Sequence, residues 1–286
     1  MVIVRYFGLA FFILIFSACS IFDKPEEIPA YLTINLPTVN TDEITQGANT
    51  HNIVDGWVYV NDEPIGVLEL PATIPILNKG KVSIDVFAGV KNNGFEAQRE
   101  NYPFYRAYSV DTVLVAKETV TLNPTFEYKA DANFLLNEDF EGLDIGLDSS
   151  QFSLGNAVFN SQVVRSGVAS AHIKLSEDRF YAEVVTKEKV VLPKLGQPIY
   201  CELDYNCDVD FEVRLISNNP DGSIYRDQII ILKSTQGNWN KVYIDLAVPV
   251  SNSQQADTYQ LGFECDLINN PREANIYLDN LKIIAD

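Results

Sequence analysis

The chain has few of the side chains on which catalytic and metal sites most often depend. Only two of its 286 residues are histidines, His51 and His172. They lie in a turn-like stretch and in a strand-like stretch, so neither a histidine-rich metal site nor an obvious Ser-His-Asp set is predicted. Paired acids for glycoside cleavage stay open, because no spacing singles out one pair among the 39 acidic residues. The sequence therefore predicts that the protein is not an enzyme.

Basic side chains are also scarce. The chain has 21 Lys and Arg residues against 39 Asp and Glu residues, which gives a formal net charge of −18. A charge of this sign and size repels nucleic acid and anionic lipid headgroups. A nucleic-acid-binding role is therefore excluded.

The four cysteines show no metal-type spacing. Cys201 and Cys265 both fall on the apolar side of alternating segments, so two buried thiols are the simpler interpretation and a disulfide between them is the alternative. Neither arrangement indicates a reactive site.

The beginning of the chain has the pattern of an export signal. Arg5 is the one charged residue before an apolar run from Phe7 to Phe16, which is too short for a transmembrane helix and typical of a secretory signal peptide. The run is followed by Ser17, Ala18 and Cys19. This segment resembles the lipobox of bacterial lipoproteins, although Phe16 stands where Leu is usual.

The resemblance implies that residues 1–18 are a cleaved lipoprotein signal peptide and that Cys19 carries lipid, including palmitate. The alternative is an ordinary signal peptide with a chance cysteine. Residues 19–29 contain two prolines and three acidic residues without a regular period, which predicts an extended tether. The acyl chains would hold the mature protein at a membrane. We expect a lipid-anchored protein of the outer membrane, facing either the periplasm or the cell surface.

The rest of the chain alternates with the period of β-strands. Apolar Leu32, Ile34 and Leu36 alternate with polar or exposed neighbours, and turn signals such as Asn92-Asn93-Gly94 recur about every ten residues. This rhythm predicts an all-β protein made of β-sandwiches. We place a boundary between residues 30–129, a β-sandwich spacer domain, and residues 130–286, a second sandwich.

The first of these domains contains the hairpin-like segment Trp57 to Gly66, with a tight turn before Pro64-Ile65-Gly66. This segment resembles small surface β-domains of the PEGA type, which implies a stalk or spacer. Trp57 lies in an alternating strand, so a core position is the simpler interpretation and a ligand platform is the alternative.

Four short motifs in the second domain occur in a characteristic order. They are Asn137-Glu138-Asp139-Phe140-Glu141, Ser166-Gly167-Val168-Ala169-Ser170-Ala171, Gly237-Asn238-Trp239, and Leu278-Asp279-Asn280-Leu281. Together they resemble the galactose-binding-like jelly rolls that include many carbohydrate-binding modules. The resemblance implies a C-terminal jelly-roll β-sandwich, and it is specific for the fold but not for sugar binding.

Two sites follow from that resemblance. In many such modules a structural calcium ion joins the first and last strands, and the matching carboxylates here are Asp139, Glu141 and Asp279. The alternative is that Asp279 only accepts hydrogen bonds from the backbone. The second site is a ligand-binding face formed by polar residues that alternate with the apolar ones: Tyr200, Glu202, Asp204, Glu212, Arg214, Gln260 and Glu264. A solvated sheet face without a ligand is the alternative.

These observations predict a lipid-anchored cell-envelope protein whose jelly roll binds a glycan or another envelope component. The rival hypothesis is a structural or assembly lipoprotein that binds a protein partner and no small ligand. Besides the membrane, a glycan or an envelope protein is therefore the expected partner.

Overall fold

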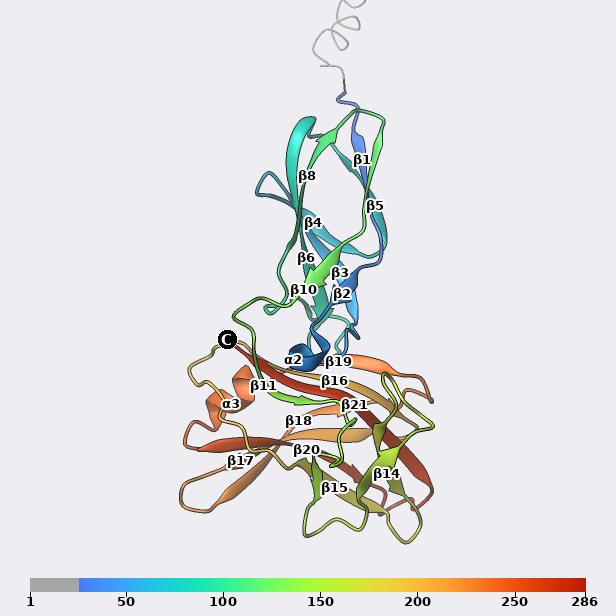
Figure 1. Cartoon of the computed structure of the whole chain (residues 1–286), viewed down its shortest axis with the longest axis vertical. Coiled ribbons are helices and arrows are strands. Elements are labelled where there is room, and N and C mark those ends of the chain that lie inside the picture. The colour runs from blue at the N-terminus through green and yellow to red at the C-terminus, as the bar shows by residue number, and fades with distance from the viewer. Residues whose placement is uncertain (1–25) are drawn as a thin grey trace, which may run out of the picture.

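A computed structural model describes residues 26–286, and its regular secondary structure is almost entirely β-strand, which confirms the all-β prediction (Figure 1). The predicted signal peptide and Cys19 lie outside the described residues, so the lipobox stays a prediction. No helix in the described part of the chain is both long enough and apolar enough to span a bilayer. We use the names first domain for residues 30–129 and second domain for residues 130–286.

Three sheets form the first domain. One has the order β5-β1-β9, with β1 (Ala30–Ile34), β5 (Ala72–Ile76) and β9 (Thr119–Leu122), and a small one pairs β2 (Thr38–Asn40) with β10 (Thr125–Glu127). The third, which we call the broad sheet, has the order β4-β3-β6-β7, with β8 also paired to β6. Its strands are β3 (Ile53–Val60), β4 (Glu63–Glu69), β6 (Gly80–Lys91), β7 (Arg99–Asn101) and β8 (Tyr108–Leu114).

Local chemistry explains the hairpin between β3 and β4. Asn61 and Asp62 both adopt positive φ, 51° and 66°. Two such residues in succession give a turn whose twist matches that of the flanking strands, and Asn and Asp tolerate this conformation better than most residues. Val58 and Val60 of β3 are completely buried, so the alternation of the strand fixes which face meets the core.

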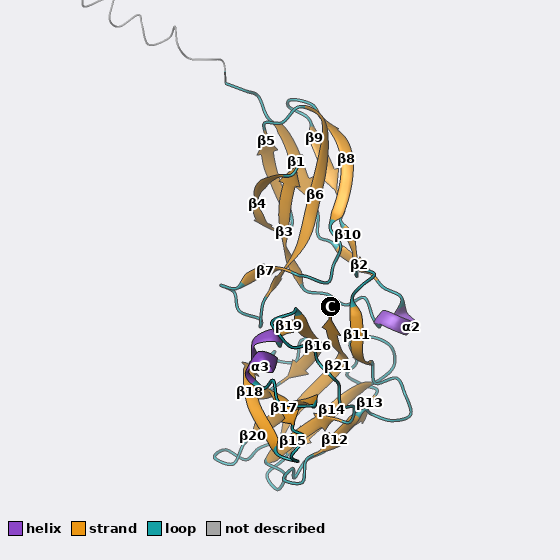
Figure 2. Ribbon diagram, turned by 90° about the vertical axis from the view of Figure 1, so that its left-hand side faces the viewer, coloured by secondary structure: helices purple, strands orange, loops and turns teal. Residues whose placement is uncertain are grey.

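The second domain is a sandwich of two sheets (Figure 2). The near sheet, which faces the first domain, has the order β13-β14-β21-β16-β19, with β11 also paired to β21; its strands are β11 (Asn133–Glu138), β13 (Ala157–Asn160), β14 (Ser170–Leu175), β16 (Ile199–Cys207), β19 (Asn240–Asp245) and β21 (Ala274–Ala285). The far sheet has the order β12-β15-β20-β17-β18; its strands are β12 (Leu147–Ser149), β15 (Tyr181–Thr186), β17 (Phe211–Asn218), β18 (Ile224–Leu232) and β20 (Thr258–Asp266). Two short helices, α2 (Glu43–Gln46) and α3 (Ala247–Asn252), lie in connections.

One hydrophobic core fills the space between the near and far sheets. Leu203 and Leu278 from the near sheet belong to the same buried cluster as Val213 and Leu261 from the far sheet. Each sheet therefore turns one face inward and leaves one outer face for other contacts. Cys201, Cys207 and Cys265 are buried free thiols, and burial raises the pKa of each.

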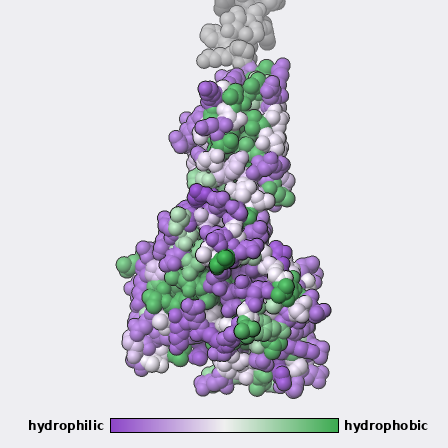
Figure 3. Space-filling model, viewed as in Figure 1, coloured by the Kyte–Doolittle hydropathy of each residue, from purple (hydrophilic) through white to green (hydrophobic). Residues whose placement is uncertain are grey.

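The two domains are stacked end to end, and the first domain packs on the outer face of the near sheet (Figures 1 and 2). The core cluster of the first domain includes Tyr200, Tyr243 and Ile284, which come from the near sheet. The backbone also joins the domains, because the N–H of Asn93 donates to the carbonyl of Tyr243 at 2.8 Å. Figure 3 shows a narrow and largely hydrophilic waist at this level.

Candidate functional site

The predicted ligand residues are divided between two sheets. Tyr200, Glu202 and Asp204 belong to β16 in the near sheet, whereas Glu212, Arg214, Gln260 and Glu264 belong to β17 and β20 in the far sheet. The prediction that all seven share one outer face is therefore wrong. Alternation shows which residues turn away from the core, but both sheets of a sandwich have an outer face, and only long-range pairing assigns a strand to one of them.

The three residues on β16 are covered by the first domain. Glu202 and Asp204 have no exposed surface, and Tyr200 is only 4% exposed. The hydroxyl groups of Tyr102 and Tyr128, both from the first domain, donate to the Glu202 carboxylate, at 2.6 Å and at 2.9 Å from Oε1. This outer face therefore binds the first domain and is closed to a ligand.

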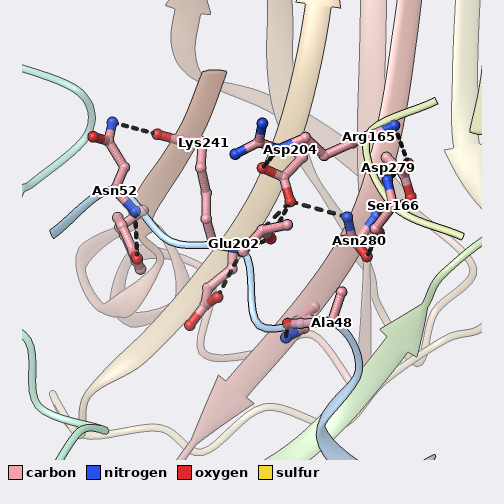
Figure 4. A network of polar contacts seen from close by, with 12 residues as sticks. Ala48, Asn52, Arg165, Ser166, Glu202, Asp204, Lys241, Asp279 and Asn280 are labelled. Atoms are coloured by element: carbon pink, nitrogen blue, oxygen red, sulfur yellow. Dashed lines mark hydrogen bonds and ion pairs between the residues drawn. The ribbon is translucent and has the colours of Figure 1, made fainter. Parts of the chain in front are cut away.

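A buried ionic network connects the two domains at this place (Figure 4). Lys241 Nζ lies 3.0 Å from Glu202 Oε2 and 3.7 Å from Asp204 Oδ2. Asp204 also accepts a hydrogen bond of 2.5 Å from Thr50 Oγ1 of the first domain and one of 3.1 Å from Asn280. Among the residues that the structure describes, Asp204 Oδ1 has no hydrogen-bond partner, and it lies 3.5 Å from Arg165 Nε. Because Glu202 and Asp204 Oδ2 have partners on the other domain and on neighbouring strands, the network specifies one orientation of the domains.

The charges in the network stabilise one another. Burial alone would lower the pKa of Lys241, but Asp204 and Glu202 together raise it above its ordinary value. Burial likewise opposes the charge on Glu202, and Lys241 and Lys282 overcome this effect, so the pKa of Glu202 is lowered. Both groups are therefore charged at neutral pH although neither reaches water.

Lys282 is the one lysine of the network whose pKa falls. Burial lowers it from 10.5 to about 8, and the nearby Glu202 only partly offsets this effect. Its Nζ donates to the carbonyl of Ala48 at 3.0 Å and lies 5.4 Å from the ring centroid of Tyr128. Burying the charged Lys282 ammonium group therefore lowers the free energy of unfolding at any pH at which the group is protonated.

That cost predicts a pH dependence of stability. The pKa of Lys282 is lower in the folded protein than in the unfolded chain, so raising the pH through about 8 removes the cost of burying its charge. The resulting stabilisation of the folded state is complete above pH 10.5 and is lost as the pH falls through about 8. We expect the free energy of unfolding of the wild type, relative to Lys282→Met, to rise by about 2 kcal/mol from pH 8 to pH 10. Urea titrations at each pH measure the difference, and two parallel pH profiles would contradict the buried, depressed lysine.

Asp279 lies at a bulge in the closing strand. The pairing of β21 with β16 shifts register here, and Asn280 adopts a φ of 49°. One oxygen of Asp279 accepts from the backbone N–H groups of Arg165 and Ser166 at 2.9 and 3.3 Å, and the other from that of Asn280 at 2.8 Å. Burial raises the pKa of Asp279 to about 7 in spite of these bonds. The carboxylate therefore joins the loop at Arg165 and Ser166 to the last strand through backbone hydrogen bonds.

The predicted calcium ligands do not form one coordination sphere. Glu141 accepts from the backbone N–H groups of Val168 and Ala169, and Asp139 accepts from that of Glu141. Among residues 26–286, no three or more His, Cys, Asp or Glu side chains are grouped so that they could hold a metal ion. Asp139, Glu141 and Asp279 therefore do not fit a calcium ion as a set of three, and calcium binding itself stays a prediction.

The far sheet carries the remaining polar residues on an open face. Glu183 of β15, Glu264 of β20 and Glu212 of β17 lie opposite one another in register, so they form a row across three strands. Arg214 contacts two of them, with its Nε 2.9 Å from Glu264 and its Nη2 2.5 Å from Glu212. Gln260 is nearly buried and accepts a hydrogen bond from Asn218 at 3.2 Å. The row combines carboxylates with guanidinium donors.

Three further residues belong to this face and were not predicted: Tyr181, Glu183 and Arg226. Arg226 Nε lies 3.1 Å from the Glu183 carboxylate, whose side chain is only 2% exposed. Burial and the nearby Glu264 raise the pKa of Tyr181 to about 12. Tyr181 and Glu183 stand at the polar positions of an alternating strand, the same signal that indicated Glu212 and Arg214, so the pattern could have found them.

A shallow pocket lies at one end of the row. It has a volume of about 240 Å³ and is lined by Asp210, Glu212, Lys233, Glu264 and Asp266 together with apolar neighbours. Burial raises the pKa of Glu264, although Arg214 opposes this shift. The row and the pocket together offer many hydrogen-bond acceptors and a smaller number of cationic donors on the face that points away from the first domain.

The two histidines are far from this face. His51 is at the domain junction, where burial lowers its pKa. His172 stacks on Tyr277 with 4.4 Å between ring centroids and shares a hydrogen bond of 3.0 Å with Asn275. Neither histidine joins the carboxylate row.

No protein-family model matches the chain, and no curated protein matches it. Similar solved structures are mainly carbohydrate-binding modules. The CBM22-1 xylan-binding domain of Xyn10C from Paenibacillus barcinonensis is 15% identical, covers 54% of this chain and 95% of its own, and has a TM-score of 0.41. The CBM22-1-CBM22-2 tandem domain of the same protein is 14% identical, covers 81% and 73%, and has a TM-score of 0.42. The enzymatically active domain of tailspike protein 4 from bacteriophage CBA120 is 11% identical, covers 52% and 20%, and has a TM-score of 0.41. The likeness concerns the fold.

Proposed function

We propose that the protein is a lipid-anchored component of the bacterial cell envelope whose second domain binds a glycan on the outer face of the far sheet. The observation that carries the proposal is the row of Glu183, Glu264 and Glu212 with its two arginines, in which Glu264, Glu212 and both arginines are partly exposed and Glu183 is buried behind Arg226. Carboxylates accept hydrogen bonds from sugar hydroxyls and guanidinium groups donate them, and such charge-assisted bonds contribute roughly 1.5–3 kcal/mol each.

The position of the face supports this role. The first domain covers the outer face of the near sheet, so the far sheet has the remaining open face of the sandwich. The described chain enters the first domain at β1, at the end remote from the second domain (Figure 1). A tether from Cys19 would therefore leave the far sheet pointing away from the membrane, with the first domain as a spacer of the PEGA-like kind.

A protein partner is the second candidate, favoured by the edge of the far sheet. Strand β18 is an edge strand, and its Ile224, Tyr225 and Ile231 are 48%, 54% and 42% exposed. An exposed edge with apolar side chains can add a strand from another protein. In this case the protein would be a structural or assembly lipoprotein.

A glycan array followed by affinity electrophoresis tests the first candidate. We expect Glu264→Gln to weaken binding of the retained glycan about tenfold, because it removes one charge-assisted acceptor from the middle of the row. Glu273→Gln is the matched control, since Glu273 is an exposed acid that pairs with Lys174 outside the row. Equal binding by both variants, or no glycan retained by the wild type, would exclude this face as a glycan site.

A further inference from the structure

Trp57 is not in the core of the first domain, so the simpler sequence-based interpretation is wrong. The indole is half-buried on the outer face of the broad sheet, whereas its neighbour Val58 is completely buried. The alternation correctly predicted a strand at β3, but the larger side chain, Trp57, lies on the solvent side and the smaller Val58 lies in the core. A tryptophan on an outer sheet face needs a reason other than core packing.

Other aromatic rings lie beside it. Trp57 pairs in register with Phe87 of β6 on one side and with Val67 of β4 on the other. Tyr59 lies two residues farther along β3, and its ring meets that of Phe87 edge to face with centroids 5.5 Å apart. Trp57, Tyr59 and Phe87 are all partly exposed, so they form an aromatic patch across two neighbouring strands.

The backbone beneath the indole is adapted to it. A Cβ at Gly89 of β6 would lie 2.6 Å from Cβ of Asp55 and 3.1 Å from Cδ1 of Trp57, so only glycine leaves room there. The Nε1 atom of Trp57 is buried without a hydrogen-bond partner. Close packing on glycine therefore fixes the indole on the sheet even though its N–H group gains no bond.

Polar groups continue the same face beyond the aromatic patch. Asp85 of β6 lies in register between Tyr59 and Ser109, and Ser109 donates a hydrogen bond to it. Next along the strands is a cleft of about 510 Å³, lined by Asn61, Lys81, Val82, Ser83, Asp111, Thr112 and Val113. The face thus places ring surfaces beside a cleft with hydroxyl, amide, ammonium and carboxylate groups.

We propose that this aromatic patch and the adjoining cleft bind a neutral polysaccharide, independently of the far sheet of the second domain. The rings offer flat apolar surfaces for the C–H faces of pyranose rings, and the cleft offers donors and acceptors for their hydroxyls. The net charge of −18 disfavours polyanionic glycans. Charged Lys81, Asp85 and Asp111 lie within the face, whereas the cores of protein interfaces are depleted of charge, which favours a sugar over a protein.

The two tryptophans of the chain, Trp57 and Trp239, make the test direct. Trp239→Phe leaves Trp57 as the single indole, and Trp57→Phe leaves only Trp239 in the second domain. Both variants are titrated with soluble xylan, mixed-linked β-glucan, galactomannan and dextran while tryptophan emission is recorded. We expect at least one polysaccharide to change the emission of Trp239→Phe and to leave that of Trp57→Phe unchanged.

Affinity electrophoresis in the same polysaccharide supplies the second measurement. We expect Tyr59→Ala to weaken retention at least tenfold and Phe95→Ala to leave it unchanged, since Phe95 is an exposed aromatic residue of the first domain outside the patch. The Glu264→Gln variant should keep the emission change of Trp57, which separates this site from the far sheet. No emission change with any of the four polysaccharides, or equal retention of Tyr59→Ala and wild type, would overturn the proposal.

Discussion

Replacing Lys241 with Met is expected to lower the free energy of unfolding by about 3–5 kcal/mol, because it removes the one cation in residues 26–286 that lies within 4 Å of both buried carboxylates. Lys241 lies 3.0 Å from Glu202 and 3.7 Å from Asp204, and its side chain is 1% exposed. Both carboxylates are completely buried, so neither can recover the lost interaction from water. Urea unfolding followed by circular dichroism measures the loss.

Two variants control this experiment. Lys174→Met breaks an exposed pair with Glu273, at 3.6 Å and with both side chains more than half exposed, and should cost less than about 1 kcal/mol. The double variant Lys241→Met with Glu202→Gln should recover part of the loss, because the amide oxygen can still accept from Tyr102 and Tyr128 without an unpaired charge. A Lys241→Met protein as stable as Lys174→Met would show that the domain junction does not depend on the network.

The second large effect is expected at Asp279. Removing its carboxylate with Asp279→Ala leaves the backbone N–H groups of Arg165, Ser166 and Asn280 without their acceptor. A buried donor left without a partner costs about 1–3 kcal/mol, and because the N–H groups of Arg165 and Ser166 are only partly buried we expect a total loss of about 3 kcal/mol. Asp279→Asn should lose less, because its side-chain oxygen still accepts one or two of these bonds.

The same variants test calcium. If Asp279 acts through the backbone alone, the loss in Asp279→Ala is equal in calcium and in chelator, and the wild type melts at one temperature in both. A wild-type melting temperature that falls in chelator, with no such fall in Asp279→Ala, would instead support the calcium predicted from the sequence. Differential scanning calorimetry in the two buffers distinguishes these outcomes.

Local patterns predicted the strands well, because a strand shows its buried face in its own sequence. Leu32 and Ile34 are buried as expected, although Leu36 just beyond the strand is exposed, and Asn61 with Asp62 forms the expected tight turn. The same reasoning failed for Trp57, since alternation does not say whether the larger or the smaller set of side chains meets the core. It failed for β16 because the partner that buries Glu202 is more than 70 residues away in sequence.

Strand periodicity, turn positions and the candidate polar residues could be predicted from the sequence alone, since each depends on side chains within a few positions of one another. The tertiary structure decided which outer face each polar residue occupies. Pairing of β16 with β19 and β21 and of β17 with β18 and β20 separates Glu202 from Glu264, and the first domain then covers Glu202 and leaves Glu264 open. The physical reason is that sheet order and domain packing depend on contacts between segments far apart in the chain, which no local period records.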